Sequence, residues 1–228
     1  MDNALVQLQI MQSVDAFFPI GAFTLSNGLE DYVLRERVTS GDDLRQYIQN
    51  FILLFPYNDL GIMALAYKNA TKPEDILTLD AVAAATKGAY EIRIGSNRMC
   101  NRYIKARAAI GDCKGNLYEY SRAVKCGKAF GIHAIALGLY GADIGANLDT
   151  LLQLYGYSVL SAIVNNAVKL VPLSQLEGQC ILNESMENLV LIVEEAKNVS
   201  IEDIGVSGVS YDIHCMNHER LYSRQYMS

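Results

Sequence analysis

A cluster of three residues near the C-terminus, His214, Cys215 and His218, has side chains suited to binding a metal ion. On a helix, positions 214 and 218 share one face, and this spacing suits two imidazole ligands of a divalent metal. The surrounding segment is rich in Gly and Ser, however, and also fits a docking peptide whose polar side chains bind a partner protein. Two interpretations stay open: a small α-helical metal-dependent hydrolase that uses these three residues, and a docking tail without a resident metal.

Sequence motifs of the common nucleotide-dependent and hydrolytic enzymes are absent. No two glycines are separated by a single residue, which excludes the dinucleotide-binding fingerprint. Gly127-Lys128 is followed by Ala129 rather than Ser or Thr, so the chain has no phosphate-binding P-loop. Neither a Gly-x-Ser-x-Gly elbow nor a His-Glu-x-x-His metalloprotease motif occurs. These absences exclude the corresponding classes of enzyme.

The composition is that of a globular protein: 51% of the 228 residues are hydrophobic and only four are prolines, which excludes disorder over most of the length. A net charge of -6 argues against a general nucleic-acid-binding protein. The five cysteines form no Cys-x-x-Cys pair and fit free thiols in a reducing compartment. The first 18 residues hold two aspartates and no basic residue, unlike a secretory signal. We therefore expect a cytoplasmic protein.

Charge is distributed unevenly along the chain. The segment from Lys87 to Lys128 holds ten basic and three acidic residues, whereas the rest holds nine basic and 22 acidic residues. Arg98, Arg102 and Lys105 share one helical face by their spacing. This face is either a solvated surface paired with acidic neighbours of the fold or a docking surface for an acidic protein. Nucleic acid fits less well, because the face lacks interleaved aromatic residues.

The hydrophobic periodicity is helical almost throughout. Thr39 and Ser40 are candidate caps of the first clear helix, and Pro56 ends it. The expected helices cover residues 44–55, 73–85, 88–110 and 117–140, and a further one includes 186–196. The pattern predicts an all-α, single-domain helical bundle over residues 1–204, followed by a flexible C-terminal docking tail over residues 205–228.

Two segments resemble helices without a polar face, 129–142 and 150–168. The first has His133 as its single titratable side chain, and the small residues Gly127 and Gly131 would let another backbone come close. The second is uncharged and long enough to span a bilayer. Its polar side chains are costly in hydrocarbon, so we expect a buried helix rather than a membrane span. Such helices lie at the centre of a bundle or supply a subunit interface.

The most distinctive peptide is FFPIGAFTLSNGLE, from Phe17 to Glu30. A turn that joins two helices accounts for its proline and Gly21. It does not account for the spacing of Ser26, Gly28 and Glu30.

This peptide, called the signature segment below, closely resembles the N-terminal motif of the UreF family of urease accessory proteins. Three later segments agree with the same family: Ser96-Asn97-Arg98-Met99; Val168 to Gln175 continuing to Gly178-Gln179; and Asp212-Ile213 followed by His218 to Arg224. The chain departs from the family pattern at Ser174, Cys100, Tyr211 and Gln225-Tyr226. The four motifs extend over almost the whole chain.

The resemblance implies an all-α protein with no enzymatic activity. UreF-like proteins form a homodimer that links the accessory protein UreD, also called UreH, to the GTPase UreG, and the assembly delivers nickel to apo-urease. We therefore expect a urease maturation factor that modulates the GTPase cycle of UreG. The complex would handle the nickel, and the chain itself would bind no cofactor stably. Neither nucleic acid nor a membrane is an expected partner.

The same resemblance implies roles for particular residues. The expected UreG face comprises Lys169, Pro172, Gln175 and Glu30. The expected UreD contacts in the tail are His218, Glu219, Tyr222, Ser223 and Arg224. Tyr157, on the uncharged helix, is the expected dimer contact. No residue is expected to be catalytic, and His214 and His218 remain weak candidates for a metal.

Overall fold

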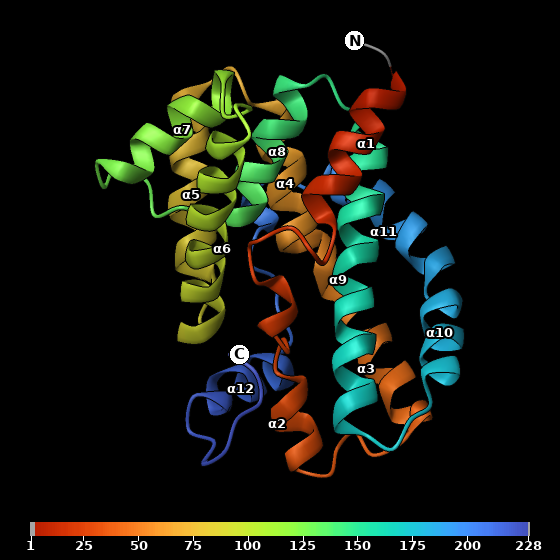
Figure 1. Ribbon diagram of the computed structural model, residues 1–228. Coiled ribbons are helices and arrows are strands. Elements are labelled where there is room, and N and C mark those ends of the chain that lie inside the picture. The colour runs from red at the N-terminus through yellow and green to blue at the C-terminus, as the bar shows by residue number, and fades with distance from the viewer. Residues whose placement is uncertain (1–2, 228) are drawn as a thin grey trace.

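Helices make up all the regular structure of residues 3–227, the part of the chain that the computed structural model describes. They pack around one another as a single bundle (Figure 1), which confirms the predicted all-α domain. The α-helices are α1 (Asn3–Val14), α2 (Leu29–Leu34), α3 (Gly41–Leu54), α4 (Asp59–Lys68), α5 (Pro73–Thr86), α6 (Tyr90–Ala109), α7 (Gly115–Lys125), α8 (His133–Asp143), α9 (Leu148–Leu170), α10 (Gln175–Glu184), α11 (Met186–Asn198) and α12 (Val209–His218). Single 3-10 turns lie at Ala22–Thr24, Phe55–Tyr57 and Ile201–Asp203.

Helix α3 begins and ends where its capping residues predict. The Ser40 hydroxyl accepts a hydrogen bond from the Asp43 amide, and the Asp43 carboxylate accepts one from the Thr39 amide at 2.9 Å. Such caps satisfy amides that have no partner within the helix. Pro56 lies in the 3-10 turn that follows the helix. The apolar stripe between these ends faces the core.

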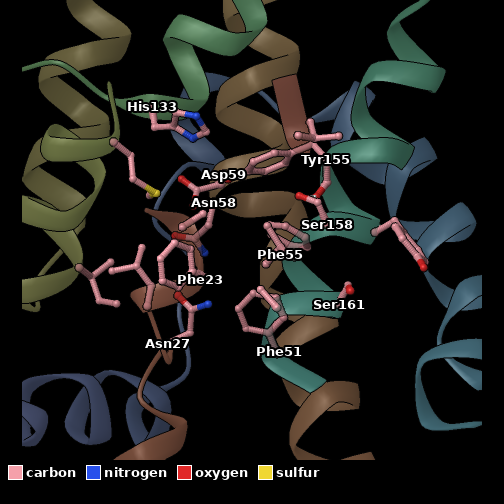
Figure 2. Close-up of a pocket in the computed structure, with 18 of the residues that line it drawn as sticks. Phe23, Asn27, Phe51, Phe55, Asn58, Asp59, His133, Tyr155, Ser158 and Ser161 are labelled. Atoms are coloured by element: carbon pink, nitrogen blue, oxygen red, sulfur yellow. Dashed lines mark hydrogen bonds between the residues drawn. The ribbon is translucent and has the colours of Figure 1, made fainter. Parts of the chain in front are cut away.

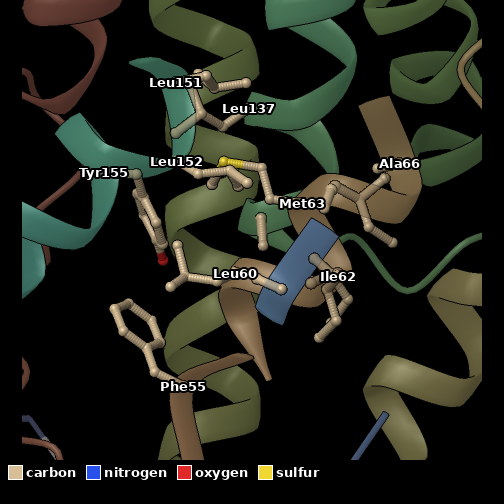
Figure 3. Packing of buried hydrophobic residues seen from close by; sticks show 14 of the residues in the cluster. Phe55, Leu60, Ile62, Met63, Ala66, Leu137, Leu151, Leu152 and Tyr155 are labelled. Atoms are coloured by element: carbon tan, nitrogen blue, oxygen red, sulfur yellow. The ribbon is translucent and has the colours of Figure 1, made fainter. Parts of the chain in front are cut away.

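The centre of the bundle is the contact between α8 and α4 (Figure 3). Every residue of α8 from His133 to Gly141 is buried, which confirms the interpretation of this apolar segment as a central helix. At Gly138 the two backbones come so close that a Cβ atom would lie 2.6 Å from the carbonyl oxygen of Met63. Gly138 therefore provides the close approach that the sequence analysis assigned to Gly127 and Gly131; a Cβ at Gly127 would meet nothing within 4 Å.

The single helix predicted over residues 117–140 is wrong, because the chain breaks between α7 and α8. Gly127 and Gly131 adopt left-handed backbone conformations, with φ of 73° and 95°. The buried carboxylate of Asp80, on α5, accepts hydrogen bonds from the Phe130 amide at 2.5 Å and the Gly131 amide at 3.0 Å. It also accepts one from the hydroxyl of Tyr120. A distant acceptor thus stabilises a break that the local pattern does not reveal.

Helix α9 runs the length of the bundle and is covered by α1, α10 and α11 on different sides (Figure 1). The Asn147 side chain caps it by accepting a hydrogen bond from the Thr150 amide at 2.9 Å. Within residues 3–227, no helix combines the length and apolar character that crossing a membrane requires. This agrees with the prediction that residues 150–168 form a buried helix.

Residues 205–227, predicted as a flexible docking tail, lie folded against the bundle. Ten of these residues form α12, which packs against α2 and α6. The chain then turns back, and the Met227 amide donates a hydrogen bond to the Thr24 carbonyl at 2.7 Å. The tail therefore lies against the signature segment, because that segment and α6 supply partners for its polar groups.

Candidate functional site

The signature segment is an irregular loop held from three sides. The Asn166 side chain of α9 donates to the Leu25 carbonyl at 3.0 Å, and the Tyr47 hydroxyl of α3 donates to the Asn27 carbonyl at 2.6 Å. On the α6 side, the Arg102 guanidinium donates to the Ile20 carbonyl at 3.1 Å. These bonds satisfy backbone carbonyls that lie outside the α-helices and therefore have no helical hydrogen-bond partner.

Gly28 of the signature segment is required by both conformation and contact. Its φ is 80°, a left-handed value that side chains other than that of glycine rarely adopt. A Cβ atom there would lie 2.9 Å from the Cys215 sulfur and 3.3 Å from the Cys215 backbone nitrogen. The Ser-x-Gly spacing of the motif therefore lets α12 lie directly against the start of α2.

Glu30 anchors the tail from the first turn of α2. Its carboxylate is buried and accepts hydrogen bonds from the Gln225 amide at 2.7 Å and the Tyr226 amide at 3.1 Å. The same carboxylate faces the Nε2 atom of His218 at 2.9 Å. Burial removes the Glu30 carboxylate from water, and the backbone amides of the tail replace the hydrogen bonds that water would donate to it.

His218 lies between two carboxylates. Its Nδ1 atom is 2.6 Å from a Glu91 oxygen on α6, while Nε2 faces Glu30. Each ring nitrogen of His218 is thus within hydrogen-bond distance of a carboxylate oxygen. Arg224 pairs with the second oxygen of Glu91. We call these four side chains, Glu30, Glu91, His218 and Arg224, the tail clasp.

One turn earlier on α12, a second histidine strengthens the same contact. The Nδ1 atom of His214 lies 2.6 Å from the fully buried carboxylate of Asp31, and the His214 ring stacks on Tyr32 with ring centroids 3.6 Å apart. The Arg35 Nε donates to both oxygens of that carboxylate, at 2.9 Å to the oxygen that faces His214 and at 3.0 Å to the other. Together the two histidines fix the orientation of α12 on α2.

The hydrolase interpretation of His214, Cys215 and His218 does not fit this geometry. The His214 Nδ1 atom and both ring nitrogens of His218 face carboxylates, and burial raises the pKa of the Cys215 thiol to about 12, which opposes the thiolate that binds metals. In the described part of the chain, no group of three or more His, Cys, Asp or Glu side chains could hold a metal ion. The cluster joins two segments of the protein instead.

Two expected partner contacts also need correction. Glu30 is only 2% exposed and His218 is fully buried, so neither side chain is available on the surface. The same motifs do leave Glu219, Tyr222, Ser223 and part of Arg224 exposed. The sequence alone could not distinguish buried residues that attach the tail to the bundle from exposed residues of the tail that a partner protein could contact.

The remaining predicted residues lie on the surface of α9 and α10. Lys169 is in the last turn of α9, Pro172 lies in the turn to α10, and Gln175 is the first residue of α10; all three are exposed. Ser174 caps α10 by accepting a hydrogen bond from the Glu177 amide at 3.0 Å. Tyr157 is 40% exposed on α9. The structure therefore separates Tyr157 from the α9–α10 turn along the same helix.

A cavity of about 720 Å³ lies between the signature segment and α9 (Figure 2). Phe23, Phe51 and Phe55 line its apolar part, and His133 lines the opposite end. Neither ring nitrogen of His133 has a hydrogen-bond partner within residues 3–227, and burial lowers its pKa to about 4. The imidazole is thus neutral near pH 7.

Beside His133, the cavity is lined by an ion pair that the sequence analysis did not single out. The Lys87 ammonium lies 2.8 Å from the Asp59 carboxylate, and the lysine side chain is nearly buried. No local pattern predicts this pair, since the two residues belong to separate segments. The only signal in the sequence was His133, the single titratable residue in the apolar stretch 129–142.

Comparison with known proteins gives a consistent result. The UreF family model matches residues 38–186. A urease accessory protein UreF of Actinobacillus pleuropneumoniae is 34% identical over 223 residues, which are 96% of this chain and 97% of that protein. The UreF protein of Haemophilus influenzae strain PittGG is also 34% identical, over 96% of this chain and 94% of its own length. That of Streptococcus salivarius strain 57.I is 29% identical, over 97% and 94%.

Proposed function

The chain belongs to the UreF family of urease accessory proteins, and from this premise we propose that it is a dimeric scaffold that links UreD to the GTPase UreG during urease maturation. Membership in the family makes it an accessory protein in urease maturation rather than an enzyme. One observation carries the finer proposal. Parts of three of the four family motifs lie on α2, on α12 with the tail, and at the α9–α10 turn, and these elements lie at one end of the molecule (Figure 1).

The UreD contact is assigned to the tail. The side chains of Val209, Ile213 and Met216 follow each other at helical spacing on α12 and are exposed, and Tyr222 is fully exposed beyond the helix. Apolar side chains beside an aromatic anchor are typical of binding hot spots. The tail clasp holds this surface in place, so Glu30 and His218 act on UreD binding through the position of the tail.

Substitution Tyr222→Ala tests the UreD assignment without disturbing the fold, because this side chain is fully exposed. After co-expression, we expect UreD to be lost from the purified complex, whereas Tyr118→Ala, a half-exposed tyrosine on α7, should retain it. Retention of UreD by the Tyr222→Ala variant at the wild-type level would contradict the assignment.

The UreG face is assigned to Lys169, Pro172 and Gln175 at the α9–α10 turn. The scaffold would bind one nucleotide state of UreG more tightly than the other, since only such differential affinity couples GTP hydrolysis to nickel transfer. Lys169→Ala should weaken UreG retention in pull-downs and leave UreD bound. Lys72→Ala, at an exposed lysine before α5, is the matched control. Equal UreG retention by both variants would remove Lys169 from the interface.

The proposed dimer places Tyr157 at the contact between copies. Tyr157→Glu should shift the purified protein to the monomer in size-exclusion chromatography with light scattering. An unchanged dimer would exclude this surface. We further propose that the scaffold works in the cytoplasm and keeps no cofactor, nickel being the cargo of the whole assembly.

The complete proposal is tested by co-expression with UreD and UreG, each omitted in turn, followed by sizing and a GTPase assay. We expect a three-protein complex only when this chain is present and a change in GTPase rate only within that complex. Full urease maturation in cells that lack this chain would refute the proposal.

A further inference from the structure

The surface of α6, α7 and the loop after α7 carries more positive charge than the fold neutralises. Of the ten basic residues between Lys87 and Lys128, five are engaged within the chain. Lys87 pairs with Asp59, Arg107 with Asp112 and Arg122 with Glu119, while Arg93 and Arg102 donate to backbone carbonyls. The interpretation of this segment as a surface paired with acidic neighbours therefore holds for only part of it.

The other five basic residues are exposed: Arg98, Lys105, Lys114, Lys125 and Lys128. None of these side chains forms an ion pair or a hydrogen bond with another residue in the described range 3–227. We call these five residues the basic face.

The acidic residues close to the basic face are occupied elsewhere. Asp80 binds the buried amides before α8, and Asp143 accepts hydrogen bonds from the first amides of α7. Asp112 accepts from the Tyr140 hydroxyl and pairs with a buried guanidinium. Glu91 is part of the tail clasp. Because each carboxylate already has internal donors, the charge of the basic face remains available to a molecule outside the chain.

Two contacts bring the segments that carry the basic face close to one another. The side chain of Asn97, next to Arg98, donates to the Phe130 carbonyl, which places α6 beside the loop that holds Lys128. At the other end, the Lys125 cation is near the Cys113 thiol. It partly offsets the rise in the pKa of this thiol that burial causes. Since Cys113 precedes Lys114, Lys125 lies near Lys114 as well. Helices α6 and α7 lie together at one side of the bundle (Figure 1).

We propose that the basic face is a docking surface for a carboxylate-rich segment of a partner protein. Its charges are confined to about 10 Å along α6 and about 16 Å along α7, from the helical rise per residue. Tyr118, which is half exposed, shares a face of α7 with Lys114 and Arg122, and tyrosine beside cations is typical of protein interfaces. A long polyanion would extend past this patch onto a chain whose remaining charge is negative, which favours a compact acidic segment.

This binding would be electrostatic and therefore sensitive to salt. Exposed ion pairs are individually weak, and the Debye length at physiological ionic strength is about 8 Å. The face would contribute mainly to the rate and orientation of association. The inference is independent of the proposed UreD and UreG contacts, which lie on other elements.

The test uses the full-length protein and a fluorescein-labelled peptide of ten glutamates, with binding followed by fluorescence anisotropy at low and physiological salt. We expect the wild-type protein to bind the peptide at low salt and release it as salt rises. The triple variant Lys105→Glu, Lys125→Glu, Lys128→Glu should bind at least about tenfold more weakly. The neutral triple variant, with Gln at the same positions, should bind the peptide with intermediate affinity. It keeps the proposal testable if the charge-reversal variant fails to fold.

The matched control changes the same total charge elsewhere, by Arg37→Glu, Lys72→Glu and Arg220→Glu, all at exposed positions. This variant should lose less than about threefold, because long-range charge effects are screened. Equal losses in the two charge-reversal variants would overturn the proposal, as would failure of the wild-type protein to bind. Tighter binding of a single-stranded oligothymidylate with the same number of charges would assign the face to nucleic acid instead and likewise overturn it.

Discussion

At the centre of the molecule α8 meets α4 through apolar side chains and a glycine, whereas at one end α12 and the tail meet α2 and α6 through charged groups. In the first region the backbones are so close that a Cβ atom at Gly138 has no room. In the second, two histidines, three carboxylates and Arg224 join segments that are far apart in the sequence. We therefore expect the first region to unfold only with the whole bundle and the second to open locally while the bundle stays folded.

The largest expected effect is that of Gly138→Val at the α4–α8 contact. The added side chain would overlap the Met63 carbonyl, and we expect a loss of about 3 kcal/mol or more in the free energy of unfolding, measured by urea denaturation. Gly127→Ala is the control, because a Cβ there meets no atom within 4 Å and only the left-handed φ opposes it, at about 1 kcal/mol. If both variants were equally stable, the close approach of the two helices would not limit stability.

An intermediate effect is expected from pH, through the buried His133. Above about pH 6.5 the imidazole is neutral in the folded and unfolded chains. As pH falls, the unfolded chain takes up a proton first, because burial lowers the folded-state pKa to about 4. Stability contributed by the neutral imidazole is therefore lost between these two values, and the loss at pH 4.5 is about 2 to 3 kcal/mol.

His133→Gln isolates this contribution from the carboxylates that titrate in the same range. The variant should lose less stability than the wild-type protein between pH 7 and pH 4.5 in urea titrations. Parallel pH profiles would mean that His133 is protonated without difficulty in the folded state and that the cavity admits water freely.

The smallest expected effect on global stability comes from the tail clasp. His218→Ala should change the free energy of unfolding by less than about 1 kcal/mol, because opening exposes the remaining carboxylates to water. Tryptic cleavage after Arg220 and Arg224, followed by mass spectrometry, should nevertheless accelerate about tenfold or more.

Glu219→Gln is the matched control for the clasp, since Glu219 is exposed on the same segment. It should leave the cleavage rate unchanged. If His218→Ala instead destabilised the protein as much as Gly138→Val, the tail would be part of the cooperative core and the contrast between the two regions would fail.

Much of the fold follows from local patterns. The caps and apolar stripe of α3, the long helix α9 and the central helix α8 were predicted from residues within a few turns of one another. Ser174 also has a local explanation, as the cap of α10. At the candidate site, the motifs pointed to Glu30 and His218 as partner contacts, whereas the structure buries both side chains.

Periodicity, capping residues and four motifs determined the helical class, the family and the positions of α3, α5, α6, α9 and α11, because such signals lie within short stretches of the chain. Tertiary structure alone decided the break between α7 and α8 and the closure of the tail. The Asp80 carboxylate is 50 residues from the Phe130 amide that it binds, and His218 is 188 residues from Glu30. A local pattern shows that a side chain can form such a bond, but only the folded chain brings its partner within reach.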